Sequence, residues 1–162
     1  MRLENDISEF MLKAAKFEFF LINKDIQLGR IEEKDNLQKL VGLDWGKLAV
    51  IIEDKHKFHD FDFKSCQFSY FKTDVPQYLV KSENGVPKWD SDEVTVDSWA
   101  KLLTRGYAQF RNNVAHGNKA QLPSAFTTER TENFLAASHA LMAFIAQDIF
   151  EERDWERSLF FG

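Results

Sequence analysis

The feature that most constrains the fold of this chain is an amphipathic helical pattern near its start. Asp6, with Glu9 three residues later, has the spacing of a capping box. Apolar residues then recur every three or four positions, as on the buried face of a helix: Ile7, Phe10, Met11, Ala14, Phe17 and Leu21. Gly29 follows as a stop signal. We therefore predict a long helix over about residues 6–28.

A second helical region is predicted over residues 36–57. Leu37, Leu40 and Val41 begin its apolar pattern, and Gly42 indicates a break. Asp44 is suited to cap the piece that follows. The apolar stripe of that piece consists of Trp45, Leu48, Ala49 and Ile52.

The third predicted helix begins near Asp97 or Ser98, since either side chain can serve as an N-cap. Its apolar face is formed by Trp99, Leu102, Leu103, Tyr107, Phe110 and Val114. Gly117 is placed to end this helix directly after His116.

A loop over residues 117–126 leads to the last predicted helix, which begins near Thr127 or Thr128 and runs to about Trp155. Glu129 and Glu132 lie in its first turn, where acidic groups are favourable. Its buried stripe consists of Phe134, Leu135, Ser138, Leu141, Met142, Ile145 and Ile149.

The segment at residues 58–95 has crowded aromatic residues without a helical period, and Pro76 and Pro87 interrupt it. The segments 77–81 and 86–90 flank Asn84-Gly85, a turn pair that favours a β-hairpin. We interpret this segment as an irregular insertion with one small hairpin. The prediction is thus a single domain over residues 1–162: an all-α, up-and-down bundle of four to five helices with an irregular middle.

Composition supports a packed domain in a reducing compartment. Hydrophobic residues make up 44% of the 162 residues, and the formal net charge is −5, so the chain is not a generic basic nucleic-acid coat. The single cysteine, Cys66, cannot form an internal disulfide.

Residues 3–9 alternate charged and apolar side chains, unlike a signal peptide, and no stretch reaches the ~18 apolar residues of a membrane span. We expect a cytoplasmic protein with no membrane partner.

One long stretch of this acidic chain is free of acidic residues. Between Ser98 and Thr128 there is no Asp or Glu, whereas the same stretch carries four cations: Lys101, Arg105, Arg111 and Lys119. One interpretation is a local site for an anion such as phosphate. The other is chance clustering combined with the preferences of helix ends.

Within this stretch lies Arg111-Asn112-Asn113-Val114-Ala115-His116-Gly117. Asn112 and His116 are one turn apart and share a helix face, so Asn112 is placed to orient the histidine. Arg111 and His116 point about 140° apart on an ideal helix. They converge through the length of Arg111, through a distorted last turn, or through a two-fold partner chain. The competing interpretation is an ordinary polar run that caps a helix.

This segment, with Phe110 before it, resembles the Arg-Asn-Asn-x-x-His-Gly version of the Arg-x4-6-His motif in bacterial families of the HEPN superfamily. The resemblance implies a metal-independent endoribonuclease without a cofactor, in which the ribose 2′-OH attacks its own phosphodiester. Arg111 then stabilises phosphoryl charge, His116 transfers protons, and Asn112 orients His116 or the RNA. Two motifs face one cleft in a homodimer.

The same resemblance makes Lys119, Arg105 and Asn113 candidate substrate-binding residues. It further implies a toxin or phage-defence effector with a cognate antitoxin protein. The alternative is a catalytically inactive HEPN module that binds nucleotides or other proteins, and the acidic net charge favours it because RNA approaches against repulsion.

The other candidates have a structural interpretation beside the functional one. His56 and His59 have the spacing of metal ligands on a helix, but no third ligand lies nearby, so we expect a solvated face and no metal. His139 is interpreted as a packed histidine, with a place beside the cleft as the alternative. The acidic run at residues 90–93 is expected to be a solvated loop, and Cys66 has no helper group for nucleophilic catalysis.

Overall fold

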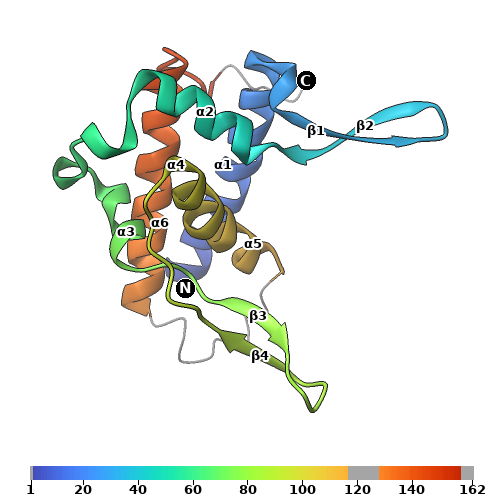
Figure 1. The fold of residues 1–162 in the computed structure, drawn as a ribbon, viewed down its shortest axis with the longest axis vertical. Helices are drawn as coiled ribbons and strands as arrows, with labels where there is room; N and C mark the ends of the chain where they lie inside the picture. The colour runs from blue at the N-terminus through green and yellow to red at the C-terminus, as the bar shows by residue number, and fades with distance from the viewer. Residues whose placement is uncertain (1, 117–127, 158–162) are drawn as a thin grey trace.

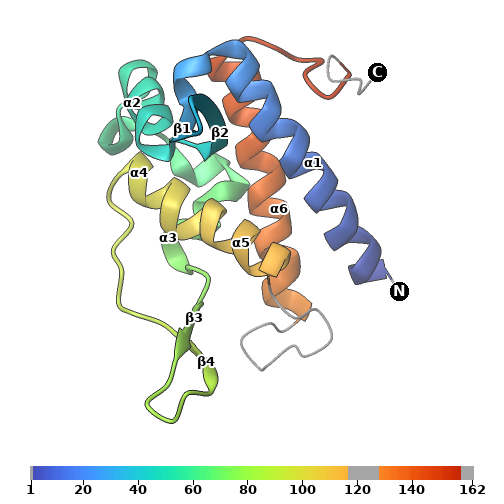
Figure 2. The ribbon, with the colours of Figure 1, turned by 90° about the vertical axis from the view of Figure 1, so that its right-hand side faces the viewer.

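The computed structural model describes residues 2–116 and 128–157, and its helices are arranged as Figure 1 shows. Many of the side chains buried between them are aromatic. Two long helices, α1 (Arg2–Lys24) and α6 (Thr128–Phe144), lie side by side (Figure 2). The shorter helices α2 (Trp45–Lys55) and α3 (Tyr70–Thr73) pack against the same core. A continuous helix from Trp99 to His116 completes the helical part.

This continuous helix has three parts: α4 (Trp99–Lys101), a π-helical segment (Leu102–Ala108) and α5 (Gln109–His116). Ser98 caps it, because its side chain accepts a hydrogen bond from the backbone N–H of Lys101 at 3.1 Å. Gly106 lies where the π segment meets α3, and a Cβ there would come within 2.8 Å of the Phe71 ring. The third predicted helix and its cap at Ser98 are therefore confirmed as far as His116.

Two antiparallel hairpins project from the helices in different directions (Figure 1). One pairs β1 (Gly29–Lys34) with β2 (Leu37–Leu43), and the other pairs β3 (Tyr78–Lys81) with β4 (Pro87–Asp90). Gly85 takes a φ of 77° in the second turn, a conformation open to glycine. The hairpin predicted around Asn84-Gly85 is confirmed.

The predicted all-α fold is wrong, because the first hairpin occupies residues that we expected to be helical. Residues 37–43 form strand β2. Asp35 and Asn36 turn the chain with φ values of 54° and 63°, and both residue types tolerate this left-handed conformation. The helical prediction holds only from Trp45, where Asp44 is the N-cap that accepts from the Lys47 N–H at 3.1 Å.

Two helix boundaries also differ from the prediction. Helix α1 covers residues 2–24 rather than 6–28, and a 3-10 turn (Ile26–Leu28) follows it. Helix α6 continues as a π segment to Ile149, whereas Trp155 lies in a turn and packs on Phe17 with 5.5 Å between ring centroids. Gly117, the loop at 117–126 and Thr127 lie outside the described residues.

The segment predicted as an insertion contributes its first half to the core. Residues 58–73 form 3-10 turns and helix α3, and four of their rings are buried: Phe58, Phe63, Phe68 and Phe71. Three of these rings surround Trp99, which is 1% exposed. In the part of the chain that the structure describes, no helix is both long enough and apolar enough to cross a membrane.

Candidate functional site

Arg111 lies on α5 and points toward α1, where it meets a carboxylate. Its Nη2 donates to Oε2 of Glu18 at 2.8 Å, and both side chains are mostly buried, at 28% and 19% exposure. Burial raises the pKa of Glu18 and outweighs the opposing effect of the guanidinium. The ion pair therefore fixes the direction of Arg111 between the two helices.

The polar groups around this pair are incompletely satisfied within the described residues. Arg111 Nη1 makes a long contact of 3.4 Å to Oδ1 of Asn112, while its Nε is buried with no partner there. The hydroxyl of Tyr107 is also buried without one. Burial raises the pKa of Tyr107, and the Glu18 charge adds to that effect. Buried polar groups of this kind are normally satisfied by water or a ligand.

Helix α5 keeps regular α-helical geometry through its last residue, His116. The backbone positions of Arg111 and His116 therefore keep the offset of about 140° expected for residues five apart. The described backbone of α5 has no distorted last turn that would bring Arg111 and His116 together. The side chain of His116, Gly117 and Lys119 lie outside the described residues.

Asn113, which we predicted to bind substrate, is buried at 7% exposure and used within the fold. Its Oδ1 accepts from Gln109 Nε2 at 2.8 Å, and its Nδ2 donates to the backbone carbonyl of Gln77 at 2.6 Å. Asn113 thus ties α5 to the residue before β3. Asn112, its neighbour, is exposed at the surface of α5.

The cations of the acid-free stretch meet carboxylates that come from outside it. Arg105 makes two hydrogen bonds to Asp92, at 2.6 and 3.1 Å, and lies 5.3 Å from the centre of the Tyr78 ring. These bonds hold the pKa of Asp92 below its usual value. Lys101 pairs with Asp97 at 3.0 Å. With Arg111 bound to Glu18, every cation of the stretch that the structure describes is paired.

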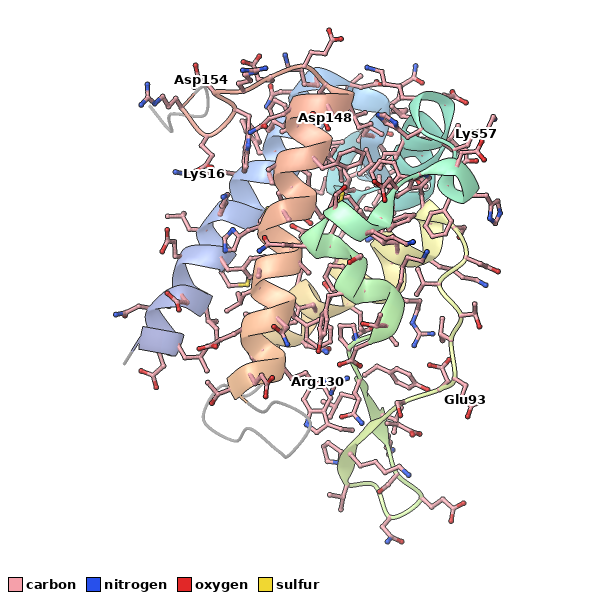
Figure 3. The ribbon with its side chains drawn as sticks, turned by 90° about the vertical axis from the view of Figure 1, so that its left-hand side faces the viewer. Lys16, Lys57, Glu93, Arg130, Asp148 and Asp154 are labelled. Carbon is pink, nitrogen blue, oxygen red and sulfur yellow. The ribbon has the colours of Figure 1, made fainter. Side chains whose placement is uncertain are left out.

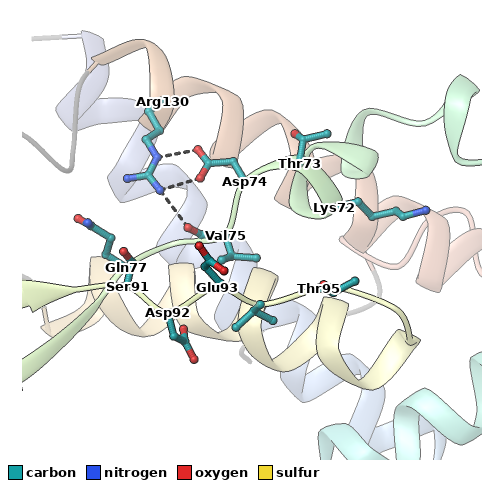
Figure 4. A pocket seen from close by; sticks show the side chains of 11 residues that line it. Lys72, Thr73, Asp74, Val75, Gln77, Ser91, Asp92, Glu93, Thr95 and Arg130 are labelled. Atoms are coloured by element: carbon teal, nitrogen blue, oxygen red, sulfur yellow. Dashed lines mark hydrogen bonds and ion pairs between the residues drawn. The ribbon is translucent and has the colours of Figure 1, made fainter.

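These partners have no local signal in the sequence because they are distant along the chain: Glu18 lies 93 residues before Arg111. A second cluster also has no local signal in the sequence: Arg130 of α6 forms an ion pair with Asp74 (Figure 4). The Arg130 guanidinium donates to both Asp74 oxygens at 2.7 and 2.8 Å and to the Val75 carbonyl at 2.9 Å. Burial alone would raise the pKa of Asp74, but hydrogen bonds from Arg130 and Tyr70 lower it.

The remaining histidines pack on aromatic rings. His56 lies against Phe61, at 5.5 Å between ring centroids, and its carbonyl accepts from Trp99 Nε1 at 2.7 Å. His139 faces Phe10 across the α1–α6 interface at 5.8 Å, and burial lowers its pKa. Within residues 2–116 and 128–157, no group of three His, Cys, Asp or Glu residues is placed to hold a metal.

No known protein family, no characterised protein and no solved structure matches this chain. The central element of the candidate site is Arg111, held by Glu18 next to Asn112 on the helix that ends at His116.

Proposed function

We propose that this chain is a metal-independent endoribonuclease of the HEPN type. The observation that carries the proposal is the fixed guanidinium of Arg111, 2.8 Å from Glu18, on a helix that stays regular up to His116. A phosphate-stabilising group needs a defined direction before the substrate arrives. The 28% of the Arg111 side chain that stays exposed leaves it an edge for a phosphate.

In the proposed reaction, a ribose 2′-oxygen forms a bond to the adjacent phosphorus and the P–O5′ bond breaks. The products are a 2′,3′-cyclic phosphate and a free 5′-hydroxyl. His116 accepts the 2′-OH proton, and a water molecule supplies the proton that the leaving 5′-oxygen takes up. Arg111 stabilises the charge on the non-bridging oxygens, and Asn112 orients His116 or the RNA.

The site is proposed to be shared between two chains. Within one copy, Arg111 points toward α1 while the backbone position of His116 faces about 140° away. A two-fold partner supplies the missing half, so that Arg111 of each copy works with His116 of the other. Such an enzyme would act on cytoplasmic RNA as a toxin or phage-defence effector restrained by an antitoxin protein.

The test is cleavage of a labelled single-stranded RNA in the presence of EDTA. We expect cleavage by the natural chain, with cyclic phosphate ends, and a loss of at least ~100-fold on replacing the proton-transfer group in His116→Ala. His59→Ala is the matched control, because His59 is an exposed histidine away from the motif. Undiminished cleavage by His116→Ala contradicts the assignment.

A second candidate is a non-catalytic HEPN module that binds nucleotides or protein. The observation that favours it is the pairing of Lys101, Arg105 and Arg111 with carboxylates, which lowers the positive potential available to RNA. RNA binding by the natural chain without product formation would support this candidate. The proposed contacts of Arg105 and Asn113 with RNA require these residues to exchange their present partners, whereas Lys119 lies outside the described residues.

A further inference from the structure

A polar pocket lies between the end of α3, the loop that follows β4 and the first turn of α6 (Figure 4). Its volume is about 370 Å³, which is within the range of pockets that hold small molecules. One wall comes from residues 72–77 and the other from residues 91–95, and Arg130 completes the lining. Figure 3 shows Glu93 and Arg130 at the same end of the molecule. Arg111 does not line this pocket, so the pocket is separate from the site proposed above.

Both walls of the pocket are held in place by contacts to the helices. On the first wall, Asp74 pairs with Arg130 at 2.7 Å, and the backbone carbonyl of Gln77 accepts a hydrogen bond from α5 at 2.6 Å. On the second wall, Asp92 pairs with Arg105 at 2.6 Å. A pocket whose walls are already fixed loses little conformational freedom when a ligand binds.

The charged groups of the pocket leave one carboxylate unpaired. Asp74 and Asp92 are neutralised by their arginine partners. The Lys72 ammonium lies 4.3 Å from the centre of the Phe63 ring and points away from the pocket in Figure 4. Glu93 has no ion pair or hydrogen bond with any described residue, and its side chain points toward the opposite wall in Figure 4. The pocket therefore favours a cation.

A second group of the pocket also requires a donor. The side-chain oxygen Oε1 of Gln77 is buried, and it accepts no hydrogen bond within the part of the chain that the structure describes. A buried acceptor of this kind is normally satisfied by water or by a ligand. Ser91 and Thr95 add hydroxyl oxygens to the lining. A ligand with several hydrogen-bond donors would satisfy these acceptors together.

We propose that this pocket binds a small organic cation with one primary ammonium group. An ammonium carries three donors and no acceptor, which matches the Glu93 carboxylate, Oε1 of Gln77 and one hydroxyl of the second wall. One unpaired carboxylate balances one positive charge. Val75 and Val94 offer apolar surface to a short carbon chain attached to the ammonium.

The first test follows the backbone amides of the isotope-labelled chain by NMR while butylammonium chloride is added up to ~20 mM, since a ligand this small binds weakly. Sodium chloride keeps the ionic strength constant. We expect shifts at residues 73–77 and 91–95, and binding at least ~10-fold tighter than that of butanol, which lacks the charge. Equal binding of butanol, or no shift of these amides at the end of the titration, overturns the proposal.

Two variants test the assigned groups. Glu93→Gln should weaken butylammonium binding at least ~10-fold, whereas Glu83→Gln on the exposed β3–β4 turn is the matched control and should bind normally. Gln77→Leu keeps the backbone carbonyl but removes the buried oxygen. It should bind at least ~5-fold more weakly and yet unfold at the same temperature as the natural chain or higher. Unchanged binding by Glu93→Gln, or an equal loss in Glu83→Gln, overturns the proposal.

Further probes identify the source of the ammonium and its charge preference. Nα-acetyl-lysine amide presents a lysine side chain as a peptide does. Tighter binding of this probe than of butylammonium would assign the pocket to a lysine side chain, and weaker binding would assign it to a free amine; both results support an ammonium site. Inorganic phosphate is the anionic probe. If phosphate shifts the same amides and butylammonium does not, Arg130 and Lys72 dominate the pocket and the proposal is overturned.

Discussion

The two hairpins of this chain are attached to the helices in different ways. The β3–β4 hairpin is held by polar anchors, since Asn113 binds the Gln77 carbonyl and Arg105 reaches Asp92 and Tyr78. The β1–β2 hairpin meets the helices at its base, where the Asp44 N–H donates to the Leu28 carbonyl at 2.7 Å, and most of its residues are exposed.

Two polar residues of the motif helix hold the β3–β4 hairpin. From the sequence, Arg105 and Asn113 were predicted to bind the substrate. In the folded chain they anchor the β3–β4 hairpin instead. Arg111 is the exception, because it turns to α1 instead. The β1–β2 hairpin differs again, because it carries apolar side chains such as Ile31 and Leu40 into solvent.

The largest expected effect comes from breaking the Asn113 anchor. Asn113→Ala leaves the partly buried Gln77 carbonyl and the Gln109 amide without their partner, so we expect a loss of roughly 2–4 kcal/mol in the free energy of unfolding. Urea denaturation measures it. The adjacent exposed Asn112→Ala is the control and should cost under ~0.5 kcal/mol. Equal losses in the two variants would remove the structural role assigned to Asn113.

A smaller effect is expected at Asp74, which ties the segment before β3 to α6. The Asp74 side chain is 32% exposed and solvent screens part of its ion pair with Arg130, so Asp74→Asn should cost about 1 kcal/mol at pH 7. The folded pKa of Asp74 is below its ordinary value of 3.8, so its contribution is present above that pH and is lost as the pH falls through the folded pKa. Denaturation midpoints of Asp74→Asn and the natural chain should therefore converge in acid, and a constant gap would contradict the assignment.

The smallest effect is expected at the tip of the β1–β2 hairpin. Leu37 is 62% exposed and pairs with Lys34 beside the turn. Leu37→Ser should change the free energy of unfolding by less than ~0.5 kcal/mol, since little apolar area leaves a packed environment. A loss above ~2 kcal/mol would mean that this hairpin is as firmly anchored as β3–β4.

Local signals predicted much of the fold. The caps at Asp44 and Ser98, the period of α1 and the Asn84-Gly85 turn depend on neighbours in sequence, and each is present in the structure. The first hairpin was missed because Leu37, Leu40 and Val41 have helical spacing. The available signal was the Asp35-Asn36 pair, whose two residue types favour a tight turn.

The candidate site was predictable only in part, for a different reason. The motif identified Arg111 and its helix, but electrostatic partners such as Glu18 and Asp92 arrive through folding and have no local signature. An acid-free stretch of sequence is therefore not an acid-free region of the folded molecule. The same holds for Leu12 and Phe19 on α1, whose exposure depends on which face of that helix the other helices cover.

Complementation between two inactive chains tests directly whether one site is built from two copies. Arg111→Ala and His116→Ala are each expected to be inactive on RNA. If each site takes Arg111 from one copy and His116 from the other, unfolding and refolding an equal mixture should restore about a quarter of the natural activity, because half of the dimers are mixed and each carries one intact site. A mixture that stays as inactive as its components, beside an active natural chain refolded in the same way, would contradict the shared site.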